Sequence, residues 1–185
     1  MPGRASAEAT GPAVSKKASD SCAKKLKALE KEAARTNRHS RPATRFSEDE
    51  INSYLALELK AKFHPSLKSL QIALQENSLS GTAEIDFNNL SMNSTKALTK
   101  LIASLFSGVH KLTVRGKLIT GDGKGSLELA EARFDGNALP NFLVSEVITA
   151  VGKKQRPPFD PLQPSQMPYS IQKVDLHPGY LIVTQ

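Results

Sequence analysis

The sequence predicts an α+β domain in which a curved antiparallel sheet of six or seven strands packs against two or three helices. Three pairs of short segments that alternate apolar and polar residues predict three β-hairpins. Each pair follows a segment whose apolar residues recur at helical spacing. The repeated order of helix and hairpin favours an antiparallel sheet covered by helices. The 185 residues suffice for one such domain at residues 43–185, preceded by a basic arm at residues 1–42.

The arm carries the excess charge of the chain. Residues 1–46 hold eleven Lys and Arg against four acids, whereas residues 47–185 hold fourteen of each, so the net charge of +7 lies almost wholly in the arm. We expect the arm to be largely disordered, with a short helix at residues 19–34 whose apolar face is thin. Such an arm can contact an anionic membrane surface or a nucleic acid, or it can simply be solvated.

The first helix and hairpin follow the arm directly. Ser47-Glu48-Asp49-Glu50 has the spacing of a capping box, in which Ser47 accepts from the backbone N–H of Glu50 and Glu50 reaches back. The helix that it starts carries Leu55 and Leu59 on its apolar face. Alternation within residues 70–87 then predicts a hairpin with one apolar and one polar face.

The second unit repeats this outline. A helix is expected where leucine and isoleucine recur at helical spacing, at Leu98, Leu101, Ile102 and Leu105. A hairpin at residues 112–134 turns at Gly121–Gly125. Its alternation changes phase before Ala132, which indicates a β-bulge.

The third unit begins at Pro140, which occupies the usual place of proline at a helix start. Its helix carries Phe142 and Val147 on the apolar stripe. A proline-rich stretch at residues 157–168 should run extended over the surface, because proline cannot occupy a helix interior or a central strand. A last hairpin at residues 171–183 closes the chain.

No catalytic or metal-binding template fits the sequence. The four histidines lie far apart, and none has a ligand residue at helical metal-site spacing. Cys22 is the sole cysteine, so no disulfide framework exists. The glycines at Gly121–Gly125 lack phosphate-loop spacing and lie between strands, which favours a turn. We therefore expect a protein that is not an enzyme and uses neither a metal nor a cofactor.

Composition bears on the possible partners. No segment has the roughly 18 apolar residues of a membrane span, and no secretory signal is visible. Trp is absent and aromatic residues make up 5% of the chain, which disfavours stacking on nucleobases. Ten basic residues between Lys16 and Arg45 could still contact phosphates, so nucleic-acid binding is the less favoured alternative.

The order of these motifs resembles the small bacterial envelope proteins of the YpmS and LmeA type, which are related to tubular lipid-binding (TULIP-like) folds. The resemblance covers residues 43–185 and rests on the helix start at Phe46–Asn52, on Leu139-Pro140 and on the closing hairpin. It implies a curved sheet wrapped against helices that bind a lipid or acyl chain in the cell envelope. Because neither a signal sequence nor an anchor is visible, this location requires one upstream; otherwise the protein is cytoplasmic.

The resemblance implies a ligand groove between the apolar face of the sheet and the helices. Its candidate lining residues are Leu55, Leu59, Ile72, Leu74, Ile85, Leu101, Ile102, Leu105, Phe142 and Val147. The same residues at the same spacing would also make an ordinary core. Gly81, Ala83 and Gly116 favour a groove, because small residues on the apolar faces of strands leave space. A scaffold domain with a protein partner is a further alternative.

Overall fold

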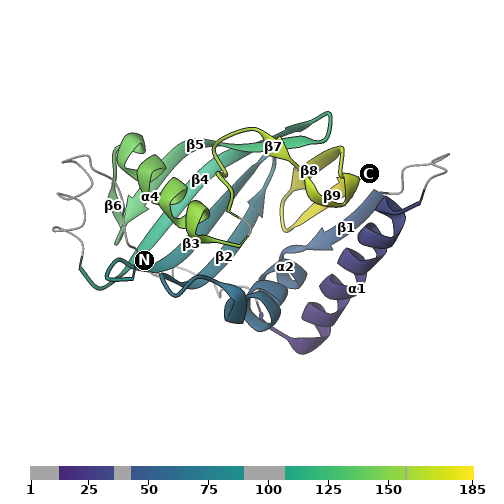
Figure 1. Ribbon diagram of the computed structural model, residues 1–185, viewed down its shortest axis with the longest axis horizontal. Coiled ribbons are helices and arrows are strands. Elements are labelled where there is room, and N and C mark those ends of the chain that lie inside the picture. The colour runs from purple at the N-terminus through teal and green to yellow at the C-terminus, as the bar shows by residue number, and fades with distance from the viewer. Residues whose placement is uncertain (1–12, 36–42, 90–106, 157) are drawn as a thin grey trace, which may run out of the picture.

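The structure is a computed structural model that describes residues 13–35, 43–89, 107–156 and 158–185. These residues form an α+β fold of antiparallel sheets and α-helices (Figure 1). The predicted fold class and its three hairpins are confirmed. The helix predicted around residues 98–105 lies outside the described residues.

The larger sheet has the strand order β2-β3-β4-β5-β6, with β7 paired to β5. Its strands are β2 (Leu67–Gln75), β3 (Ser78–Asp86), β4 (Val109–Gly121), β5 (Lys124–Phe134), β6 (Asn137–Ala138) and β7 (Ser165–Gln166). The β4–β5 turn needs only Asp122 and Gly123, both at positive φ, as in the tightest hairpins. The expected bulge is present, because Arg115 pairs with Glu131 while Gly116 pairs with Leu129.

The last hairpin belongs to a second, three-stranded sheet instead of extending the first. This sheet has the order β1-β9-β8 and contains β1 (Ala43–Ser47), β8 (Lys173–His177) and β9 (Tyr180–Thr184). The two sheets meet at Thr120, whose hydroxyl donates to the Val174 carbonyl and accepts from the Val174 N–H, both at 3.1 Å. Backbone hydrogen bonds also join them, from Asn77 N to Leu176 O and from Gly179 N to Leu74 O, both at 3.2 Å.

Helix α2 (Glu48–Tyr54) begins with the predicted capping box, and five π-helical residues, Leu55–Leu59, continue it. Ser47 Oγ accepts from Glu50 N at 3.2 Å, and Glu50 Oε2 accepts from Ser47 N at 2.8 Å. The buried Asn52 side chain bonds both the N–H and the C=O of Ile72 at 2.7 Å. It thereby covers part of the edge of β2 as a neighbouring strand would.

Helix α1 (Lys16–Ala33) corrects the expectation for the arm. It begins at Lys16 instead of residue 19, and it packs on the domain although its apolar face is thin. Cys22 and Leu29 are 3% and 2% exposed. Their partners come from distant parts of the chain, Phe46, Ile171 and Val183. The helix is therefore part of the folded structure.

A second and larger core lies between the six-stranded sheet and α4 (Asn141–Lys154), which follows Pro140 as predicted. Figure 1 shows α4 lying over the face of β4 and β5. Val144 and Val147 of α4 are buried there against β-strand residues such as Leu112 and Phe134. The two cores share no buried residue. None of the helices in the described ranges has the length and apolar character of a membrane span.

Candidate functional site

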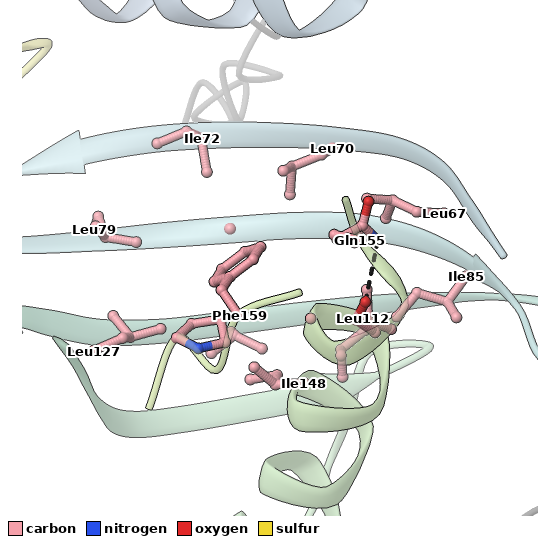
Figure 2. Close-up of a pocket in the computed structure, with 16 residues that line it drawn as sticks. Leu67, Leu70, Ile72, Leu79, Ile85, Leu112, Leu127, Ile148, Gln155 and Phe159 are labelled. Atoms are coloured by element: carbon pink, nitrogen blue, oxygen red, sulfur yellow. Dashed lines mark hydrogen bonds between the residues drawn. The ribbon is translucent and has the colours of Figure 1, made fainter. Parts of the chain in front are cut away.

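An apolar groove of about 270 Å³ lies between the six-stranded sheet, α4 and a segment that we call the strap (residues 158–163). The apolar faces of β2, β3, β4 and β5 form its floor (Figure 2). Helix α4 and the strap form its wall through Ile148, Val151, Gly152, Gln155, Phe159 and Pro161. The alternation of the strands therefore exposes one face of the sheet to a space that α4 covers only in part.

Small residues in the centre of the sheet keep this space open. Gly81 and Ala83 of β3 lie on the floor, between larger residues such as Leu79 and Ile85. A Cβ on Gly81 would have Ile72 Cδ1 as its nearest neighbour, at an ordinary 3.7 Å. Gly116 does not leave space as predicted, because a Cβ there would meet Glu128 O at 2.4 Å. That glycine allows close approach of β5 at the bulge instead of leaving space.

The strap is fixed to both neighbouring elements. Phe159 N donates to Gly152 O at 3.2 Å, and Leu127 N donates to Pro161 O at 2.8 Å. A Cβ on Gly152 would lie 2.4 Å from Phe159 O, so only glycine permits this crossing. The Asp160 carboxylate accepts from Thr149 Oγ1 at 3.3 Å. The proline-rich stretch therefore closes one side of the groove, and it holds the half-exposed Phe159 ring there (Figure 2).

Gln155 contributes the one polar side chain among the described residues that line the groove. Its amide nitrogen donates to Val151 O at 3.1 Å, and its oxygen accepts from His64 N at 3.5 Å. An amide is neither an acid, a base nor a nucleophile at ordinary pH. Both polar atoms of Gln155 thus bond the protein itself, and the groove offers an almost wholly apolar surface that suits an apolar molecule.

The predicted lining residues divide into several groups. Ile72 and Ile85 line the groove. Leu74 and Val147 are core residues, 2% and 4% exposed. Leu101, Ile102 and Leu105 lie outside the described residues.

The remaining predicted lining residues face elsewhere. Phe142 is 57% exposed, because it lies about 200° around α4 from the buried Val144 and therefore faces away from the core. Leu55 lines a smaller cleft of about 110 Å³ at the edge of β2, which shares only Leu70 with the groove. Leu59 is half-buried in the π-helical turn and lines neither space.

Sequence reasoning missed the residues that the strap and the end of α4 contribute. Ile148, Val151 and Gln155 follow one another at helical spacing, and this pattern could have identified the inner face of α4. For Phe159 the available signal was its position as an aromatic residue inside a proline-rich stretch.

Outside the groove, His110 and Asp135 form a hydrogen-bonded pair in which both pKa values are shifted. A 2.7 Å hydrogen bond with Asp135 raises the pKa of His110, and the same bond lowers the pKa of Asp135. Ser107 O lies 3.0 Å from the other ring nitrogen, and Phe134 stacks on the ring. Within the described ranges no three His, Cys, Asp or Glu side chains gather as metal ligands.

Comparisons with protein-family models and with curated protein sequences find no match for this chain.

Proposed function

We propose that this domain binds a lipid or another apolar ligand in the groove, without catalysing a reaction on it. The observation that carries the proposal is an apolar space of about 270 Å³ beside small residues of a sheet. This volume lies just below the lower limit of ligand pockets, roughly 300 Å³. It suits a single acyl chain or a compact apolar molecule. The bacterial cell envelope is the proposed location, on the basis of the resemblance to proteins of the YpmS and LmeA type.

The groove makes a quantitative prediction for chain length. A buried methylene contributes about 0.8 kcal/mol, so each added carbon should raise the affinity of a fatty acid by about fourfold. The increase should stop when the chain fills the space beside Phe159 and Gly81. A surface that binds detergent-like molecules unspecifically would show no such limit.

The test uses the purified full chain and a dansyl-labelled undecanoic acid. We expect its fluorescence to rise on binding and saturated fatty acids of increasing length to displace it, with a plateau. Native mass spectrometry of gently purified protein should find a bound lipid. A matched pair of variants locates the site: Gly81→Leu points into the groove, whereas Ser80→Leu points to the opposite face of β3. Binding that is absent in the wild type, or equal in both variants, would refute the proposal.

A further inference from the structure

Helix α1 is held firmly to the rest of the molecule. Besides its buried Cys22 and Leu29, it makes polar contacts at both ends. The Gln185 side chain donates to Leu29 O at 2.8 Å, and Lys16 binds Glu58 at 2.8 Å. Side chains from the middle of the helix bond Glu50 of α2, which keeps the pKa of Glu50 low although its burial opposes this. The orientation of α1 is therefore fixed, and so is the surface that it presents.

The outer face of α1 is a row of lysines. At about 100° per residue, four exposed lysines fall within an arc of about 80°, nearly opposite the buried face. They are Lys17, Lys24, Lys27 and Lys31. The row is about 21 Å long, at 1.5 Å per residue. We call it the lysine row.

The lysine row is uncompensated within the described part of the chain. Other basic residues of this segment have carboxylate partners: Lys16 pairs with Asp20 and Glu58, Lys25 with Glu50 and Arg35 with Glu32. No described carboxylate forms an ion pair with a lysine of the row. Asp20 lies within the same arc and pairs with Lys16, which also pairs with Glu58. The outer face of α1 therefore presents a net positive charge, interrupted at Asp20.

We infer that the lysine row docks the protein on an anionic lipid bilayer. Lysine is a strongly hydrated point charge, suited to diffuse contact with headgroups, and the row contains no arginine or aromatic residue that would read nucleic acid. Two exposed apolar residues lie near the N-terminal end of α1: Val14, two residues before the helix, is 49% exposed, and Leu57 is 47% exposed. Leu57 precedes Glu58, which binds Lys16 of α1. Basic residues beside apolar ones are typical of a surface that lies at a membrane interface.

The size of the effect follows from the number of charges. A lysine near an anionic membrane strengthens binding by about fivefold, so four together should strengthen it by roughly 600-fold at low salt. The attraction weakens at high salt, because the Debye length shortens. Docking through the row is independent of the groove and does not rest on its proposed ligand.

The test measures co-sedimentation of the full chain with vesicles of phosphatidylcholine, with or without phosphatidylglycerol. One variant replaces the four lysines of the row by glutamine. The control removes the same charge elsewhere, through Lys111→Gln, Lys117→Gln, Lys124→Gln and Lys153→Gln. We expect salt-sensitive binding to the anionic vesicles alone, lost in the row variant and largely kept in the control. Circular dichroism should show both variants folded, since all eight side chains are exposed.

Three results would overturn the inference. The wild type could fail to bind anionic vesicles at low salt, or the two variants could weaken equally, which would make net charge the sole cause. Alternatively, a single-stranded RNA could compete the protein off the vesicles at far lower concentration, which would make nucleic acid the preferred partner. Dansyl-undecanoic acid binding, measured on the same variants, should be unchanged. Loss of dansyl-undecanoic acid binding would count against the groove, whereas loss of co-sedimentation with vesicles would report on the lysine row.

Discussion

Gly81→Leu tests directly whether the groove is an empty space in solution. Gly81 lies in the middle of β3, opposite Ile72 of β2 and Val114 of β4. Its backbone is not in the left-handed region, and a Cβ would make only one ordinary contact, 3.7 Å from Ile72 Cδ1. A leucine at this position therefore has room to extend over the floor of the groove.

The expected change in stability follows from this geometry. A fully buried leucine side chain contributes about 1.5–3 kcal/mol, and replacing a glycine within a strand removes a penalty of about 0.5–1 kcal/mol. Loss of side-chain entropy costs about 0.5–1 kcal/mol, and the groove is partly open to solvent. We expect a net stabilisation of about 1–2 kcal/mol, which raises the Tm by about 2–8 °C for a chain of this size.

Thermal unfolding followed by circular dichroism measures the shift, and dansyl-undecanoic acid binding measures the loss of the site. Ser80→Leu should change the stability by no more than about 0.5 kcal/mol and leave binding intact. If the interior were already filled, the added leucine would overpack it and lower the stability by about 1–3 kcal/mol. A lowered Tm for Gly81→Leu with unchanged probe binding would therefore refute the reasoning.

Three further predictions concern the strap, α1 and the histidine pair. Gly152→Ala should destabilise the protein by about 1–3 kcal/mol and weaken probe binding, because the Cβ would lie 2.4 Å from Phe159 O; a higher Tm would contradict the close crossing. Burial raises the pKa of Cys22 to about 11, so at pH 8 the thiolate fraction should be about 100-fold smaller than in the unfolded chain. Iodoacetamide should therefore alkylate Cys22 slowly in the native protein; rapid alkylation would show that α1 detaches readily. The contribution of the His110–Asp135 pair to stability should be complete below the usual His pKa of 6.5 and be lost as pH rises through the raised pKa of His110. At the acid end it should be lost as pH falls from the usual Asp pKa of 3.8 through the lowered pKa of Asp135. Urea unfolding measured across this pH range should show the largest free energy of unfolding between these two limits. Asp135→Asn should remove this maximum.

Local sequence rules predicted the start of α2 and most strands of the larger sheet. The capping box depends on Ser47 and Glu50, three residues apart, and the structure forms both of its hydrogen bonds. The change of phase before Ala132 marked a bulge that the strand pairing contains. These features were predictable because each depends on residues close together in the chain, where propensity and periodicity act.

The groove and the packing of α1 depend on contacts that local rules do not reveal. Alternation showed which face of β3 is apolar, but not whether α4 fills the space above it, since that depends on the path of the strap past Gly152. The thin apolar face of α1 predicted weak packing. It is buried nonetheless, because Ile171 and Val183 reach it from the other end of the chain. Pairings of this sequence separation leave no periodic signal.

The two cores also separate the two proposed activities. The core under α4 adjoins the groove, whereas the core under α1 supports the lysine row, and no buried residue belongs to both. Substitutions more than about 7–10 Å apart with no shared partner usually act independently. A change at Gly81 should therefore remove ligand binding while vesicle docking persists, and loss of the lysine row should have the reverse effect. If the protein works at a membrane, docking and ligand uptake are then coupled through position and not through a shared structural change.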